Sequence, residues 1–213
     1  MRVRFRFFVL AVLVLAAGGW LWLRSSLPAL DGEMAVRGLT APATVERDAH
    51  GVPTVTASSR EDLARATGFV HAQDRYFQMD LLRRKAAGEL SALFGSAAVE
   101  ADRRLRIHRF RALAENAVAQ GPASDRAIVE AYAEGVNAGL AALGARPFEY
   151  LLLRQNAVPW QPGDSVVVLF SMFLDLLDEG GERDAERGVL ESVLPGAVGA
   201  WGTPPGPPWD APL

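Results

Sequence analysis

Seven hydrogen-bonding side chains crowd the segment from residue 68 to 90, GFVHAQDRYFQMDLLRRKAAGEL. They are Gln73, Asp74, Arg75, Gln78, Asp80, Arg83 and Arg84. On an open helix surface such ion pairs would each contribute only about 0.3–0.5 kcal/mol. The large apolar residues between them leave too little outer surface, so the charges are expected to lie partly between packed elements, with defined partners. The segment favours a buried structural network over a catalytic one, because it supplies no nucleophile with a base.

Two histidines near this segment are further candidates for acid–base chemistry. His50 and His71 could transfer protons near neutral pH, but a structural role is the favoured interpretation, and lone histidines are poor grounds for a metal site. The chain has no cysteine, so it offers neither a disulfide nor a thiolate metal site.

The charge distribution argues against a nucleic-acid partner. The formal net charge is −3, but the first 30 residues hold four arginines and no acid. The rest of the chain carries 18 basic and 25 acidic residues, a balance of −7. A body of this sign has no electrostatic attraction for phosphate backbones. The full chain is 50% hydrophobic, which predicts a globular domain with a real core.

The N-terminus predicts export. Arg2, Arg4 and Arg6 precede an uncharged run from Phe7 to Leu23, which is at the low limit for crossing a bilayer. No clean small-residue cleavage site precedes Arg24, so residues 1–24 are interpreted as a signal anchor, with a cleaved signal peptide as the alternative. The membrane segment would be residues 7–23, and residues 25–213 would lie on the periplasmic or extracellular side.

The remaining elements are predicted from turn residues and periodicity. Residues 25–43 are expected to form a linker, and residues 44–48 and 52–56 a hairpin with Pro53 at an edge or a strand start. Ser58 or Ser59 would cap the next helix, and Gly88 and Gly95 punctuate the end of this stretch. One face of this helix, at spacings of three or four, would hold Leu63, Ala66, Val70, Gln73, Phe77 and Leu81, and the many large apolar residues require two or more faces to be covered. Further helices are expected at about 99–119, at about 125–143 with Ser124 as cap, and at about 164–178. Residues 202–213 form a proline-rich tail.

An ordered set of motifs resembles the opening of the penicillin acylase family, which comprises N-terminal-nucleophile amidohydrolases. The motifs are VERDAHGVPTVTA, EDLARATGFVHAQDRYFQMDLLRRKAAGELSALFG, AYAEGVN, PFEYLLL and VPWQPGDS. Each is weak alone, but their order and spacing together are specific. The resemblance runs from about residue 28 to 200.

The resemblance implies an α+β fold, namely the mostly helical small-subunit part of an αββα N-terminal-nucleophile hydrolase preceded by a membrane helix. Residues 44–201 would be that small-subunit region. In such enzymes a large catalytic chain carries the nucleophile, and the nucleophile's own α-amino group is the base, so His50 and His71 would be structural. The implied reaction is hydrolysis of the amide bond of N-acylated substrates, of the beta-lactam or acyl-homoserine-lactone type.

The resemblance also leads us to expect that this chain is inactive alone. The family matures by cutting before a Ser, Thr or Cys, and no such junction follows the family-like region. Gly95-Ser96 lies between predicted helices and is rejected as a junction. The chain would be a truncated product, a precursor fragment or a separately encoded subunit.

Substrate and metal residues follow from the same resemblance. The acyl pocket would include Phe173, Leu176 and Leu177, an apolar set in which Leu176 stands where some relatives have arginine. The alternative is that these side chains pack in the core. Calcium shared with the large chain would be bound by Asp184, with Glu182 and Glu186 as rival ligands and a solvated charged run as the alternative. A hard cation needs about six to eight oxygens, so one carboxylate is insufficient.

A second class of function competes with the enzyme. A non-catalytic, membrane-anchored binding or assembly protein derived from an acylase would retain the same scaffold motifs. A large chain encoded with this one would favour the amidase, and its absence from the locus would favour the binding protein.

Overall fold

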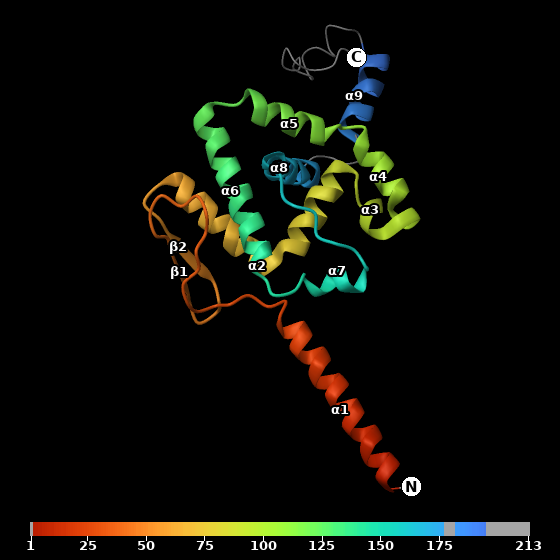
Figure 1. Ribbon diagram of the computed structural model, residues 1–213. Helices are drawn as coiled ribbons and strands as arrows, with labels where there is room; N and C mark the ends of the chain where they lie inside the picture. Colours follow the sequence, from red (N-terminus) through yellow and green to blue (C-terminus); the bar gives the residue numbers. More distant parts are fainter. Residues whose placement is uncertain (1, 177–181, 195–213) are drawn as a thin grey trace. The chain divides into compact units, whose positions relative to one another are not determined.

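The computed structural model describes residues 2–176 and 182–194, and the described part is mostly helical, as predicted (Figure 1). Its chain divides into two compact units, residues 1–171 and 172–213. The elements are α1 (Arg2–Arg24), β1 (Thr44–Arg47), β2 (Pro53–Thr56), α2 (Arg60–Ala87), α3 (Ser91–Phe94), η1 (Gly95–Ala98), α4 (Val99–Arg106), α5 (Phe110–Gln120), α6 (Ala123–Ala141), α7 (Phe148–Leu152), α8 (Pro162–Leu176) and α9 (Glu182–Val193).

The two strands form the predicted antiparallel hairpin, with Arg47 opposite Pro53. The Asp48 carboxylate accepts hydrogen bonds from the backbone N–H of His50 at 2.8 Å and of Val52 at 2.9 Å, which closes the turn. Gly51 has φ +79°, a value that favours glycine. Pro53 begins β2, the strand-start position expected for a residue without a donor.

Helix α2 begins after a predicted cap residue and ends at a predicted glycine, but it is kinked in the middle. The Ser59 side chain accepts a hydrogen bond from the N–H of Asp62 at 3.0 Å, and Gly88 ends the helix in the left-handed conformation. Arg75 leaves helical geometry (φ −153°, ψ 32°), so the helix is kinked there. Beyond the kink Tyr76 and Met79 are buried. Of the predicted helical face, Ala66 and Val70 are buried, whereas Leu63 is 41% exposed.

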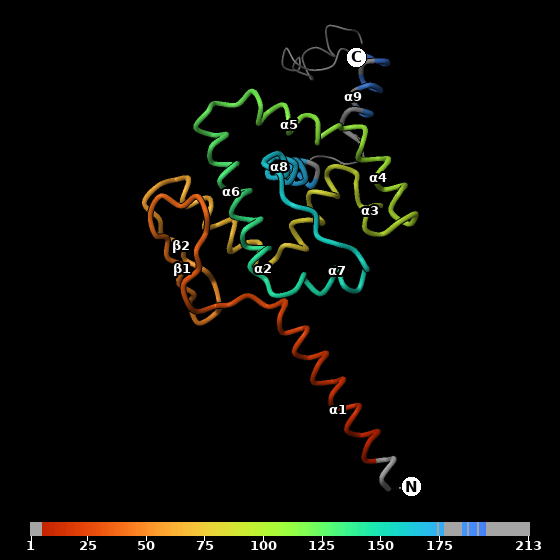
Figure 2. The backbone as a smooth tube through the Cα atoms, in the orientation of Figure 1, coloured from red at the N-terminus to blue at the C-terminus, as the bar shows by residue number. Residues whose placement is uncertain are grey.

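Helices α2 and α6 cross closely enough for backbone to touch backbone, as the tube in Figure 2 shows. A Cβ at Gly135 would lie 1.9 Å from the carbonyl oxygen of Arg65, and one at Gly68 would lie 2.3 Å from that of Tyr132. Only glycine permits this approach. The core of the first unit forms around the crossing, from Ala72, Tyr76, Met79, Leu93, Ala133, Val136, Tyr150 and Trp160.

Two helix predictions need correction. The single helix expected at 99–119 is two helices, α4 and α5, separated at Arg109, whose φ is +53°. Phe110 turns inward after this break, where it is 7% exposed and stacks on Phe170 with ring centroids 4.8 Å apart. Helix α6 begins at Ala123, and Pro122 rather than Ser124 occupies its N-cap position.

Helix α1 contains one stretch, Arg6–Arg24, that is long and apolar enough to cross a membrane. Its mean hydropathy is 2.0, and none of it is buried inside the protein. Both a retained anchor and a signal sequence fit this length and composition.

Candidate functional site

The crowded polar helix forms a buried ion-pair network centred on Asp80. One oxygen of this carboxylate accepts hydrogen bonds from Arg83 Nε at 2.7 Å and Arg84 Nε at 2.9 Å. Its other oxygen accepts the hydroxyl of Tyr150 at 2.7 Å. Asp80 and Tyr150 are fully buried. Burial raises the pKa of the Tyr150 hydroxyl, and its bond to Asp80 raises it further, so the group remains a donor.

Arg83 joins this helix to the start of α8. Its guanidinium donates to the carbonyl oxygens of Val158 at 2.7 Å and Pro159 at 3.1 Å, and to the carboxylate of Asp164. The same guanidinium lies over the Trp160 ring, 5.0 Å from its centroid. Burial alone would lower the pKa of Arg83, but the nearby carboxylates, Asp164 first, raise it instead.

Asp164 receives partners from three directions. It accepts from the backbone N–H of Gln161 at 2.7 Å, within the first turn of α8, where a negative charge is favourable. It also accepts from Arg111 at 3.0 Å, and Arg111 forms a two-bond pair with Glu89 at 2.6 and 2.8 Å. These links fasten α2, α5 and the start of α8 together. The predicted buried network is confirmed for Asp80, Arg83 and Arg84, whereas Asp74, Arg75 and Gln78 on the same helix are exposed.

The segment before α8 is fixed from the other side by α6. Asn137 exchanges two hydrogen bonds with the backbone of Trp160, at 2.8 and 2.9 Å. The Trp160 indole N–H donates to the hydroxyl of Ser165 at 3.1 Å. Asn137 belongs to the motif AYAEGVN and Trp160 to VPWQPGDS, so the motifs of the sequence meet in space at this point.

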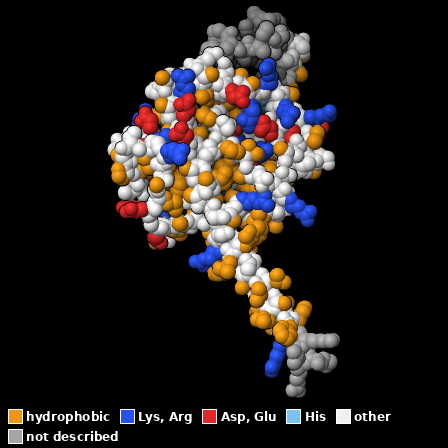
Figure 3. Space-filling view, in the orientation of Figure 1, with side chains coloured by type: hydrophobic (Ala, Val, Ile, Leu, Met, Phe, Trp, Pro, Cys, Tyr) orange, Lys and Arg blue, Asp and Glu red, His pale blue; other side chains and the backbone are white. Residues whose placement is uncertain are grey.

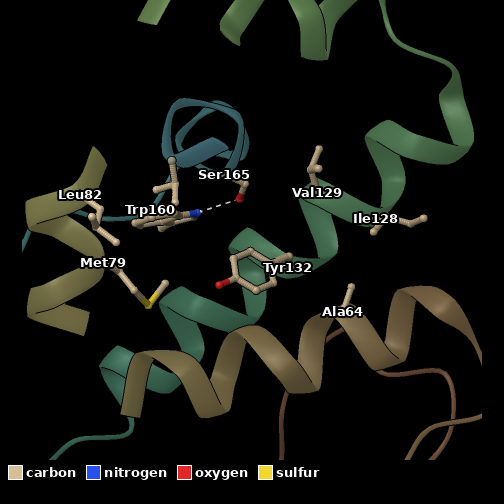
Figure 4. Close-up of a pocket in the computed structure, with 9 residues that line it drawn as sticks. Ala64, Met79, Leu82, Ile128, Val129, Tyr132, Trp160 and Ser165 are labelled. Carbon is tan, nitrogen blue, oxygen red and sulfur yellow. Dashed lines mark hydrogen bonds between the residues drawn. The ribbon is translucent and has the colours of Figure 1, made fainter. Parts of the chain in front are cut away.

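A hollow of about 260 Å³ lies between α2, α6 and α8, close to this network (Figure 4). Its walls are mostly apolar, and the lining residues are Ala64, Met79, Leu82, Ile128, Val129, Tyr132, Trp160, Ser165 and Val168. Figure 4 shows the Tyr132 hydroxyl on the side toward Met79, while Ser165 is held by Trp160. The hollow therefore favours an apolar group over a charged one.

Neither histidine has a catalytic arrangement. The ring of His71 is hydrogen-bonded through Nδ1 to the Tyr132 hydroxyl at 2.9 Å. Burial lowers the pKa of His71 and raises that of Tyr132 to about 12, so at neutral pH the pair is uncharged. His50 is exposed in the hairpin turn. In the part of the chain that the structure describes, no Ser or Thr hydroxyl is hydrogen-bonded to a histidine.

The predicted substrate residues fall partly within the described structure. Phe173 and Leu176 lie on α8 and are 52% and 81% exposed. Leu177 lies outside the described residues. The structure tests no substrate contact, so the acyl-pocket role stays a prediction.

The predicted metal ligand stays a prediction as well. Asp184 lies in the first turn of α9, but its side chain is outside the described set. Among the described residues there is no group of three or more His, Cys, Asp or Glu side chains that could hold a metal ion.

Sequence reasoning found one half of the network and missed the other. Asp80, Arg83 and Arg84 were singled out, whereas Arg111 and Glu89 were not. Tyr150 and Asp164 lie 70 to 81 residues from their partners, so helical spacing carries no signal for them. The signal that was available is their membership of PFEYLLL and VPWQPGDS.

Comparison with known proteins gives this arrangement a family. The penicillin amidase family model matches residues 42–204. The chain is 43% identical over 155 residues to the penicillin acylase 2 proenzyme of Pseudomonas sp. strain SE83, covering 69% of this chain and 19% of that protein. It is 33% identical over 193 residues to the acyl-homoserine lactone acylase QuiP of Pseudomonas putida, covering 82% and 22%. The chain therefore belongs to the penicillin amidase family.

A solved structure supports the fold. The thermostable penicillin G acylase from Alcaligenes faecalis matches with a TM-score of 0.59 and 28% identity, covering 81% of this chain and 98% of that chain. By contrast, this chain spans about a fifth of the length of the curated relatives named above.

Proposed function

We propose that this chain is the small-subunit part of an amidase that hydrolyses the amide bond of N-acylated substrates together with a large catalytic chain. Family membership over residues 42–204 supports the reaction class. The relatives named as penicillin and acyl-homoserine lactone acylases support an N-acyl amide substrate. The large chain would supply the nucleophile and the oxyanion donors, and this chain would be inactive alone.

The observation that carries the proposal is the contrast between the two ends of α8. Its start is locked by the buried Arg83–Asp164 pair and by Asn137, and such rigidity suits a site that must hold a substrate. Its later part instead presents apolar side chains to solvent. The exposed ones are Leu169 (63%), Met172 (56%), Phe173 (52%) and Leu176 (81%). Exposed apolar groups on one helix fit a surface that a partner chain and an acyl group cover.

The acyl group in this proposal is aromatic or aliphatic. Phe173, Leu176 and Leu177 offer no charge to recognise a polar acyl chain. Phe173→Ala should therefore shift the ratio of kcat/KM values between a phenylacetyl and a fatty-acyl amide by about tenfold, as loss of an apolar contact allows. The assay uses a proenzyme of the family in which this chain's residues 42–204 replace the aligned segment.

Leu113→Ala is the matched control, because Leu113 is 50% exposed on α5 and carries no proposed substrate contact. It should leave the ratio unchanged. An unchanged ratio in the Phe173→Ala protein, at normal stability, would remove Phe173 from the pocket.

Calcium shared between the two chains is a further part of the proposal. Asp184 followed by Arg187 precedes an apolar run, as expected for the small chain's single acidic ligand. Because calcium needs about six to eight oxygens, the other ligands must come from the large chain. Calorimetry on the two-chain protein should show calcium affinity falling at least about tenfold with Asp184→Ala. An undiminished affinity would transfer the role to Glu182 or Glu186, or remove it.

The last part of the proposal is that the chain is exported across the membrane. With α1 kept as an anchor, residues 25–213 act on the periplasmic or extracellular side of the membrane, where the positive-inside tendency places them.

A further inference from the structure

We propose that the surface around the end of α1 rests on the lipid bilayer, with Leu27, Leu30, Phe148 and Leu152 immersed in the membrane interface. The occupant of this surface is the lipid itself rather than a protein. The inference goes beyond amide hydrolysis, and it rests on α1 being retained as an anchor.

The length of α1 is the first argument. Its uncharged run from Phe7 to Leu23 has 17 residues. At 1.5 Å per residue this run is roughly 25 Å long, less than the ~30 Å hydrocarbon core of a bilayer. A span shorter than the bilayer brings the residues that flank it into the interface. The surface that follows Leu23 is therefore where the protein should meet lipid.

The second argument is that the folded body begins at the end of this helix. The carbonyl of Ser25, one residue beyond α1, accepts a hydrogen bond from the N–H of Ala145 at 3.0 Å. Gly144 packs so closely that a Cβ there would lie 3.0 Å from the same oxygen. The turn between α6 and α7 is thus held against the end of α1, so a body anchored by α1 must keep this turn beside the membrane.

Exposed apolar side chains surround this contact. Leu27 and Leu30 are each 64% exposed, Phe148 is 48% exposed and Leu152 is 76% exposed. Leu27 and Phe148 also line one hollow of about 390 Å³, which places the segment after α1 and the start of α7 side by side. Figure 3 shows hydrophobic side chains gathered where α1 joins the body. Facing water, such a patch is unfavourable, whereas a membrane interface would bury it.

The charges near the patch match a lipid surface. Arg24, Arg146 and Arg154 are exposed, and Arg24 lies over the ring of Trp20 at 5.2 Å, a pairing suited to the interface. Arg146 is held by the Gln155 carbonyl at 2.7 Å and by Asn156 at 2.6 Å.

The same segments also carry three acids. Asp31 and Glu33 follow Leu30, and Glu149 lines the hollow. The rim around the apolar side chains therefore carries charges of both signs, and its exposed arginines can pair with lipid phosphates, at about 1 kcal/mol each near an anionic surface.

The absence of cysteine gives a direct test. Leu152→Cys places a single thiol in the patch for an environment-sensitive dye. Ser124→Cys is the matched control, exposed at the far end of α6 and roughly 25 Å along that helix from its last residue. The full-length chain is reconstituted into phosphatidylcholine and phosphatidylglycerol vesicles. Quenching by nitroxide-labelled lipids is then compared with quenching by aqueous iodide.

The dye in the Leu152→Cys protein should be quenched by the labelled lipids at least about threefold more strongly than the dye in the Ser124→Cys protein, because interfacial groups sit ~5–10 Å into the headgroup and acyl boundary. Iodide should show the opposite order. Equal quenching at the two positions, or a chain that fails to float with the vesicles, would overturn the proposal. Amide hydrolysis is measured on the family proenzyme that carries residues 42–204 of this chain, which lacks α1. A failure of the membrane proposal therefore leaves the amidase proposal untouched, and the reverse holds as well.

Discussion

At the residue scale, Asp80 is the group on which most of the buried network depends. Its two oxygens satisfy Arg83, Arg84 and Tyr150, all within the core of the first unit. A buried ion pair adds little net stability compared with an apolar replacement, but removing one partner leaves buried charge without compensation. Single members of the network should therefore be costly to remove.

Asp80→Ala should therefore lower the free energy of unfolding by about 3–5 kcal/mol. Urea unfolding of the full-length chain in detergent, followed by tryptophan fluorescence, measures this change. Trp160 lies against Arg83, so its emission reports directly on the network.

Glu100→Ala is the matched control for charge removal. Glu100 pairs with Arg104 at 3.7 Å, and the side chains of the two are 67% and 77% exposed. Its loss should change the free energy by no more than about 0.5 kcal/mol. If Asp80→Ala were as mild as this control, the network would not hold α8 in place.

At the element scale, the crossing of α2 and α6 depends on glycines. A methyl group at Gly135 would meet the Arg65 carbonyl at 1.9 Å, a contact that backbone movement alone can relieve. Gly135→Ala should therefore destabilise the chain by about 1–3 kcal/mol or more. The same urea titration of the full-length chain measures the effect.

Gly163→Ala provides the comparison within another helix. A Cβ there would lie 3.7 Å from Glu115, an ordinary contact. Alanine is the better helix former, so this change should be neutral or stabilising by up to about 1 kcal/mol. Equal losses for the two substitutions would mean that helix propensity, not close packing, decides the result.

The sequence predicted the ends of helices and strands well where an end depends on the chemistry of one nearby residue. Ser59, Gly88 and Pro53 occupy the cap and strand-start positions that their chemistry favours. The break at Arg109 was missed because it depends on Phe110 packing against Phe170, a residue 60 positions away. The kink at Arg75 was missed as well, since periodicity assumes an unbroken helix. The same holds for the candidate site. The pairing of Asp80 with Arg83 could be predicted from their helical spacing, whereas Asp164 could be found only through its motif.

At the scale of the whole molecule, two groups of exposed apolar side chains among the described residues carry the proposals. One is the apolar part of α8, with Phe173 and Leu176. The other is the patch around Leu27 and Leu152 at the end of α1. The proposals assign the first surface to a catalytic partner with its acyl substrate, and the second to the membrane.

The central claim is that this chain does the work of an amidase small subunit, and one measurement tests it most directly. Residues 42–204 replace the aligned segment of the Pseudomonas penicillin acylase 2 proenzyme, and hydrolysis of a panel of chromogenic N-acyl amides is measured. The account predicts kcat/KM within about two orders of magnitude of the parent proenzyme for at least one acyl group, since the nucleophile and oxyanion donors are retained. The 213-residue chain alone should show no turnover. A folded replacement protein without amidase activity, or turnover by the chain alone that a substitution within it abolishes, would contradict the claim.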